Sequence, residues 1–136
     1  MDWRERYNQR TVIADEAVKA VKSGDRVCVP VYPHPHELLD ALARRRDELR
    51  GVELWIDAPS SDPGWLQLDW QDSFAVVADQ IIGDLARPSL DDRIIDYSPM
   101  VFSNQLKGYS APHRDERLID VLMVVVSPPD EEGFCG

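Results

Sequence analysis

The alternation of apolar and polar residues predicts a helix followed by a strand near the start of the chain. In ADEAVKAVKSGDRVCVPV, Val18 and Val21 share one helical face, and acidic residues stand in the first turn, where the helix dipole favours them. Gly24 is placed to end the helix in a left-handed conformation. The apolar run that follows, residues 27–31, predicts a short strand interrupted by Pro30.

The next segment repeats this pattern. In YPHPHELLDALARRRDELRG, leucines at helical spacing, including Leu39 and Leu42, predict an inner face. Pro35 suits the first position of this helix, and Gly51 closes it. The run VELWIDA, residues 52–58, predicts another strand. A strand, a helix and a strand joined by short connectors indicate a parallel sheet covered by helices.

The middle of the chain gives weaker patterns. APSSDPGWLQLDW is rich in turn residues and predicts a loop. Apolar residues in SFAVVADQIIGDLARP, residues 73–88, fall at helical spacing and predict a helix that Pro88 ends. RIIDYSPMVF predicts a strand bent at Pro99, and the polar segment SNQLKGYSAPHRDER predicts a loop or a short helix.

The run Val121–Val126 has apolar residues on both faces, which is typical of a central parallel strand buried above and below. Such a strand needs neighbours on both sides and helices on both faces. The whole sequence supplies about four strands and three helices, barely enough for this arrangement. We therefore expect an α/β fold whose sheet is incomplete.

Composition narrows the class of protein. Of 136 residues, 43% are hydrophobic and 29% charged, an ordinary mixture for one globular domain. Fifteen basic and 25 acidic residues give a net charge of −10, which argues against nucleic-acid binding. No apolar run is long enough to span a bilayer, and MDWRERYNQR lacks the apolar core of a signal peptide, so a cytoplasmic protein is expected. Cys28 and Cys135 indicate no disulfide framework, and Cys28 is expected in a buried strand.

Candidate binding residues stand where two predicted strands end. Tyr32, His34 and His36 follow the first strand, at the carboxyl edge where α/β proteins collect their sites. They either line a substrate pocket or belong to a helix cap and loop surface. Ser127 and Pro128 follow the last strand, as a pocket wall or a rigid turn. No metal site is expected, because a zinc site in a protein has three or four ligands and two histidines are too few.

Two other groups have alternative interpretations. Trp65 and Trp70 in the middle loop either cap the core or stack on an adenine ring. The arginines of residues 44–46 either form a solvated helix face or reach phosphates of a ligand.

Several segments together resemble one family. MDWRERY, EAVKAVKSGDRV, ELLDALARRRDELRGVELW, DYSPMVFS and above all DVLMVVVSPPDEEGFCG are similar, in the same order, to the N-terminal part of the acetyl-CoA hydrolase/transferase family, which includes the 4-hydroxybutyrate CoA-transferases. VSPPDEEGFC is the most specific piece. The resemblance covers residues 1–136 and implies an open three-layer α/β fold of the CoA-transferase type with a mainly parallel sheet.

The resemblance also implies a reaction, the transfer of CoA between an acyl-CoA and a small carboxylic acid through a glutamyl-CoA thioester. The CoA thioester is then a substrate, and no covalently bound cofactor is expected. The nucleophilic glutamate of the family belongs to the C-terminal half, so no catalytic residue is assigned here. The glutamates that do not match it are Glu5, Glu16, Glu37, Glu48, Glu53, Glu116, Glu131 and Glu132.

One departure from the family leaves an alternative open. Family members usually carry a glycine-rich loop after the first strand, whereas this chain has VPVYPHPHE. The chain is therefore either a segment or subunit completed by a C-terminal half or a partner chain, or a non-catalytic small-molecule-binding or interaction module. Completion by another part predicts exposed apolar surface at Val121–Val126, and an unfinished sheet favours homo-oligomers.

Overall fold

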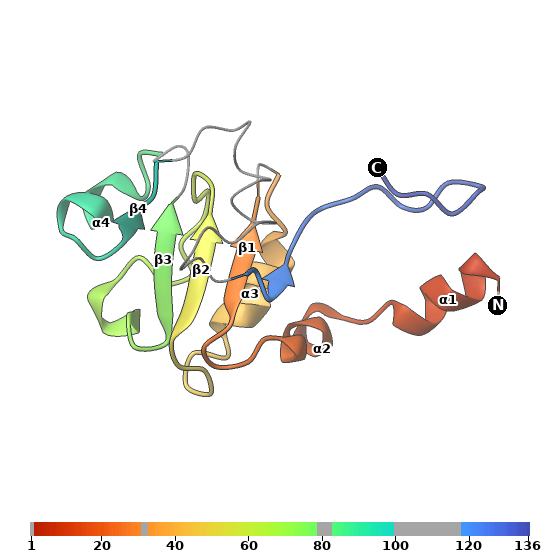
Figure 1. The fold of residues 1–136 in the computed structure, drawn as a ribbon, viewed down its shortest axis with the longest axis horizontal. Helices are drawn as coiled ribbons and strands as arrows, with labels where there is room; N and C mark the ends of the chain where they lie inside the picture. The colour runs from red at the N-terminus through yellow and green to blue at the C-terminus, as the bar shows by residue number, and fades with distance from the viewer. Residues whose placement is uncertain (1, 31–32, 79–82, 100–117) are drawn as a thin grey trace.

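The computed structural model of the chain describes residues 2–30, 33–78, 83–99 and 118–136, and it shows one sheet with the two chain ends extending away from it (Figure 1). The described strands are β1 (Arg26–Val29), β2 (Val52–Ile56), β3 (Phe74–Ala78), β4 (Asp96–Tyr97) and β5 (Val121–Leu122). The helices are α1 (Trp3–Arg10), α2 (Ala14–Ala17), α3 (His36–Ala43) and α4 (Arg87–Asp91), with 3-10 turns η1 (Val18–Ala20) and η2 (Leu68–Trp70). Within these ranges, no helix is long and apolar enough to cross a membrane.

The described strands pair in the order β4-β3-β2-β1-β5, and every one of these pairings is parallel. Val27 lies opposite Leu54, and Leu54 lies opposite Val76, so these side chains point to the same face of the sheet. α3 lies between β1 and β2 in the chain and makes the crossover that a parallel pair requires. The prediction of an α/β fold with a parallel sheet is confirmed.

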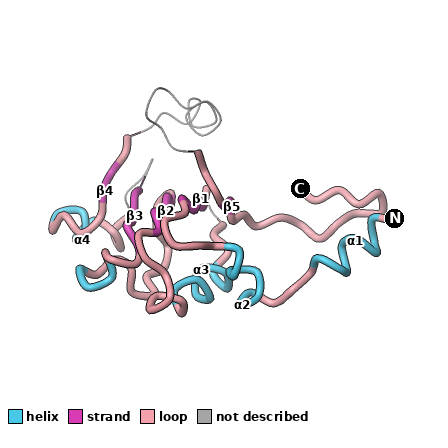
Figure 2. The backbone as a smooth tube through the Cα atoms, turned by 60° about the horizontal axis from the view of Figure 1, so that its bottom comes forward, coloured by secondary structure: helices cyan, strands magenta, loops and turns pink. Residues whose placement is uncertain are grey.

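α2, η1 and α3 cover one face of the sheet (Figure 2). Leu39 and Leu42 of α3 are fully buried and belong to one cluster with Val27, Leu54 and Phe74. Burying one such side chain stabilises the fold by roughly 1.5–3 kcal/mol. The inner face predicted for this helix is confirmed, and it positions the loops at the carboxyl edge of the sheet.

The opposite face of β1 and β2 carries polar side chains. An Nη atom of Arg26 lies 2.7 Å from a carboxylate oxygen of Glu53, and the guanidinium lies 5.0 Å from the ring centre of Trp55. Cys28 is buried on this face as a free thiol, as the sequence predicted. This face is therefore tied together by charge and ring contacts rather than by aliphatic packing.

The second helix is shorter than its leucine pattern predicts. α3 ends at Ala43, and Pro35 is its N-cap rather than its first helical residue. Beyond the helix, the Arg45 guanidinium donates hydrogen bonds to the carbonyl oxygens of Val18 and Val21. Arg45 therefore holds two helical segments together, and it does not belong to a solvated face.

The helix predicted over residues 73–88 is wrong in its first part. Phe74, Val76 and Ala78 are buried, Ala75 is exposed, and this alternation is that of a strand. The run FAVVA fits a period of two as well as a helical period, and pairing with β2 decides between them. Residues 79–82 lie outside the described residues.

The remaining middle segments agree with the sequence where they are described. Trp65 is buried and Trp70 half-buried, and each ring centre lies 6.1 Å from that of Phe74, so both tryptophans cap the core. β4 confirms a strand before Pro99. The segment predicted as a loop or short helix, residues 103–117, lies outside the described residues.

The prediction of a doubly buried central strand over Val121–Val126 is wrong. β5 ends at Leu122, stands at the edge of the described sheet and pairs with β1 alone. Met123 is the last buried residue, and Val124–Val126 are exposed because no second neighbour among the described strands covers them. The chain then leaves the sheet and runs toward α1 (Figures 1 and 2).

Candidate functional site

The loops that follow β1 and β2 meet at the carboxyl edge of the sheet through two contacts. His34 Nδ1 lies 2.9 Å from the hydroxyl oxygen of Ser60, and His36 Nδ1 lies 3.2 Å from that of Ser61. The two imidazole ring centres are 6.3 Å apart. In open α/β sheets, ligands bind outside the carboxyl ends of the strands, so these four side chains form the candidate site.

The turn after β2 brings the serines to this position. The backbone N–H of Asp57 donates to the carbonyl oxygen of Val29, with 3.4 Å between nitrogen and oxygen, which continues the pairing of β2 with β1. Ala58 then adopts φ 42°, in the left-handed region that costs a non-glycine residue roughly 1–2 kcal/mol. Strained residues of this kind cluster at ligand sites. This turn redirects the chain toward the loop of His34.

His34 is the buried member of the site, with 3% of its surface exposed. Burial lowers the pKa of His34 below 6.5; its backbone hydrogen bond to Asp57 opposes this, and the neighbouring His36 adds to it. The imidazole is therefore neutral at pH 7, with one nitrogen as donor and the other as acceptor. A neutral, buried imidazole forms a fixed polar wall without adding charge.

His36 is exposed and is the first residue of α3. A helix N-terminus carries partial positive charge, so oxygen atoms with negative charge are favoured beside it. Tyr32, the third candidate from this loop, lies outside the described residues. Two imidazoles and two hydroxyls can therefore orient a carboxylate or a thioester carbonyl at this edge.

The same side chains are a poor metal site. Two imidazoles fall short of the three or four ligands that zinc takes in proteins. Across the described ranges, no three histidine, cysteine or acidic side chains come together in a way that could hold a metal ion.

Ser127 and Pro128 lie elsewhere and do not join the histidines. The Ser127 amide donates to the carbonyl oxygen of Gly136 across 2.7 Å, and the Gly136 amide donates back to the Ser127 hydroxyl across 3.0 Å. Pro128 lines a cavity of about 320 Å³ beside α1. The structure thus divides the predicted binding residues between the sheet edge and the chain ends.

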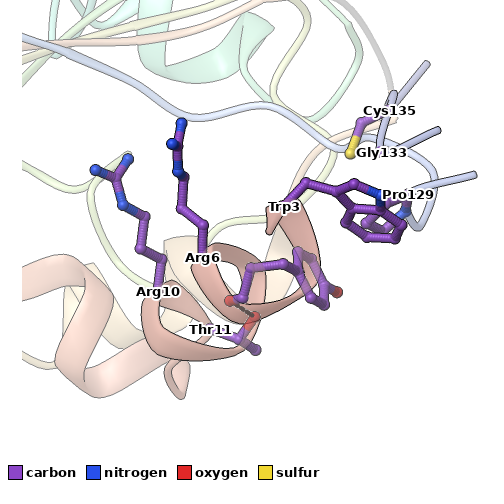
Figure 3. A pocket seen from close by; sticks show the side chains of 8 residues that line it. Trp3, Arg6, Arg10, Thr11, Pro129, Gly133 and Cys135 are labelled. Carbon is purple, nitrogen blue, oxygen red and sulfur yellow. Dashed lines mark hydrogen bonds between the residues drawn. The ribbon is translucent and has the colours of Figure 1, made fainter. Parts of the chain in front are cut away.

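A second cavity, of about 400 Å³, lies between α1 and the C-terminal residues (Figure 3). Trp3 lies against Pro129 and Gly133, while Arg6 and Arg10 extend side by side from α1. Within the described part of the chain, neither arginine has a carboxylate partner. The cavity is lined by Trp3, Arg6, Tyr7, Arg10, Thr11, Pro129, Gly133 and Cys135.

Sequence reasoning missed Ser60, Ser61 and the residues of α1. The serines had one usable signal, because they follow a strand whose carboxyl end shares an edge with that of β1. In α1, Arg6 and Arg10 are four residues apart, and this spacing places them on one helical face.

Comparison with known sequences gives relatives along nearly the whole chain, although no family model matches. The chain is 33% identical to the butyryl-CoA:acetate CoA-transferase of Anaerostipes caccae, over 98% of this chain and 30% of that protein. It is 28% identical to the 4-hydroxybutyrate coenzyme A transferase of Clostridium kluyveri, over 100% of this chain and 31% of that protein. It is 30% identical to the succinyl-CoA:cyclohexane-1-carboxylate CoA transferase of Geobacter metallireducens, over 97% and 29%.

Comparison with solved structures shows that the fold of this chain occurs in a known structure. The crystal structure of RipA from Yersinia pestis matches with a TM-score of 0.81 at 22% identity, and the match covers 99% of this chain and 33% of that chain. A mutant of RipA matches with a TM-score of 0.82. At this identity the match establishes the fold alone.

These comparisons define what the chain corresponds to. The three curated relatives named above are all CoA-transferases, and the alignments include almost every residue of this chain. The chain spans about 30% of the length of these relatives. The chain is therefore similar, over nearly all of its residues, to the N-terminal part of CoA-transferases.

Proposed function

We propose that residues 1–136 form the N-terminal segment or subunit of an acyl-CoA:carboxylate CoA-transferase, with coenzyme A thioesters and small carboxylic acids as substrates. The observation that carries this proposal is the alignment of at least 97% of the chain with three CoA-transferases. Two of these relatives are named for an acyl-CoA and a carboxylate that exchange CoA.

In this proposal the chain supplies one wall of the site and another polypeptide segment supplies the chemistry. A carboxylate nucleophile would split CoA exchange into two easier steps, and the glutamate for it comes from the C-terminal half or from a partner chain. The four side chains at the sheet edge are two histidines and two serines, so none of them is the carboxylate nucleophile.

We assign the wall to the loop after β1. Tyr32, His34 and His36 line the acyl and carboxylate pocket, with His34 held by Ser60 and His36 beside the start of α3. A neutral His34 avoids a second charge near a bound carboxylate, while the exposed His36 is available to orient it. Ser127 and Pro128 contact CoA or the completing segment from the chain ends.

The two cysteines are compatible with a cytoplasmic site of action. Cys28 is buried, Cys135 is exposed, and both are free thiols, which suits a reducing compartment. We also propose homo-oligomers, because the described sheet of this chain is unfinished and favours association.

Thermal-shift titration of the purified chain with butyryl-CoA tests the proposal. A ligand that binds only the folded state stabilises it by about 2.7 kcal/mol at 100 times its dissociation constant, which raises the melting temperature by several degrees. We expect this rise, and we expect His36→Ala to reduce it. Lys19→Ala is the matched control, because Lys19 is exposed and its ammonium group pairs with Glu16.

The opposite result points to a different class of function. No shift with any CoA ester would defeat the CoA-site assignment for this chain. A shift with another metabolite, alongside no shift with CoA esters, would instead support a small-molecule-binding module that keeps the fold. The loop after β1, which has histidines and prolines where glycines are usual, is the feature that favours this second function.

A further inference from the structure

Beyond Met123 the chain leaves the described sheet, with the backbone of residues 124–126 unpaired among the described residues. The exposed fractions of Val124, Val125 and Val126 are 49%, 45% and 53%. The Met123 amide donates to the carbonyl oxygen of Cys28 across 2.9 Å, whereas the amides and carbonyls of residues 124–126 make no backbone hydrogen bond within the described part of the chain. Unpaired backbone beside exposed aliphatic side chains is a template for adding a strand.

The two ends of the chain form one structural feature, which we call the terminal arm: residues 2–13 together with residues 124–136. They lie side by side in both views (Figures 1 and 2). They also touch, because a Cβ atom added to Gly133 would come within 2.8 Å of the Trp3 ring.

The terminal arm has little packing of its own. α1 has eight residues and none is buried, and an isolated helix this short is marginal in water. Val12, Ile13 and Phe134 are 55%, 69% and 69% exposed. A short helix and unpaired backbone, both with exposed apolar side chains, are typical of a region that another protein surface covers.

The structural comparison indicates which surface this is. The match to RipA includes 99% of this chain, so it includes the terminal arm, and it covers only 33% of the RipA chain. The curated relatives likewise extend well beyond the aligned 29–31% of their length. The arm therefore lies within the part of the chain that aligns with these longer polypeptides.

We infer that the terminal arm is the docking surface for the polypeptide that corresponds to the remaining two-thirds of a CoA-transferase. A strand of that polypeptide pairs with residues 124–126, and its apolar residues cover Val12, Ile13 and Phe134. This inference rests on the proposed function, because it names the part that brings the catalytic glutamate.

Binding in solution tests the inference. The tagged 136-residue chain is coexpressed with the part of the Anaerostipes caccae relative that follows its first third. The same part coexpressed with that relative's own first third is the positive control. We expect a stable complex with this chain. Val125→Glu should weaken it by about tenfold or more, because a charge would enter the new strand pair. Leu68→Glu, a change at an even more exposed apolar residue on η2, should leave it intact.

The outcomes separate the inference from the proposed function. No complex where the positive control forms one, equal binding by Val125→Glu and the unchanged chain, or self-association through the arm in place of this complex would overturn the docking surface. A complex that Val125→Glu disrupts but that transfers no CoA would keep the docking surface and reject the proposed function. Circular dichroism of the Val125→Glu chain alone should be unchanged, which shows that the substitution acts on binding.

Discussion

His34 Nδ1 lies 2.9 Å from the Ser60 hydroxyl oxygen, and this contact joins two loops whose residues are 26 apart in the chain. The imidazole is buried, whereas the serine is at the surface. The contact therefore anchors an exposed loop to a buried group, and it fixes the shape of the carboxyl edge before any ligand arrives.

Replacing Ser60 by alanine should lower the free energy of unfolding by about 1 kcal/mol, because the buried imidazole of His34 loses a hydrogen-bond partner. Ser61→Ala is the matched control, since its partner His36 is exposed and can bond to water instead. Urea denaturation of the two variants measures the difference. Equal losses would show that burial of His34 does not matter to this contact.

Acid should destabilise the chain through His34. Its pKa in the folded state is lowered by burial, so the unfolded state binds a proton more readily. The stabilisation by neutral His34 is complete above its unfolded pKa of about 6.5, and it is lost as the pH falls toward and through the lower folded pKa. Denaturation curves recorded from about pH 7.5 down to about pH 5, a range that spans the unfolded pKa of His34, should show a falling free energy of unfolding.

Two variants assign this pH dependence. His34→Gln should flatten the curve below the unfolded pKa of His34, and His36→Gln should reduce its slope only in part, because the neighbouring His36 adds to the lowering of the His34 pKa. Asp130 has a lowered pKa because the Phe134 amide, above all, bonds to its carboxylate, and this group titrates below 3.8, outside the window. The same slope in His34→Gln and the unchanged chain would assign the effect to other groups.

Gly64→Ala should be far more destabilising than Gly24→Ala. Both glycines have a positive φ, 133° and 80°, so both substitutions strain the backbone. A Cβ atom at Gly64 would also lie 2.3 Å from the Trp70 ring, while one at Gly24 meets open space. We expect about 1–2 kcal/mol for Gly24 and several kcal/mol for Gly64 in thermal or urea unfolding. Similar values would mean that the Trp70 ring moves aside at little cost.

The order of β1, α3 and β2 could be predicted from the sequence because each element depends on local spacing. Leu39 and Leu42 fall on one helical face whatever surrounds them, and the glycines before β1 and β2 end the preceding segments. β3 could not be assigned this way, since FAVVA satisfies both a strand and a helical period and only pairing with β2 distinguishes them.

The candidate site was half predictable. The rule that sites collect at carboxyl edges pointed to His34 and His36, but their serine partners depend on how two loops fold against each other. The prediction of a doubly buried strand failed at Val124–Val126, because an apolar run indicates that covering neighbours are needed and does not show whether they are present.

The end of β5 makes a separate prediction about stability. Met123→Ala should cost about 2–5 kcal/mol in urea denaturation, because Met123 is buried in the core cluster. Val125→Ala should change stability by less than about 0.5 kcal/mol, because its side chain is exposed. A large loss from Val125→Ala would show that the strand continues in solution beyond Leu122.

The purified chain alone should transfer no CoA between butyryl-CoA and acetate. In the proposed function the nucleophilic glutamate comes from the C-terminal half or from a partner chain, so this chain alone lacks the group that would accept CoA. Chromatography of the CoA esters measures transfer, and mass spectrometry after borohydride treatment detects a glutamyl thioester. The chain mixed with the remaining polypeptide of the Anaerostipes caccae relative is the comparison sample, in which transfer is expected. Steady turnover by the chain alone, with a thioester on one of its own glutamates, would contradict the division of labour proposed for the two parts.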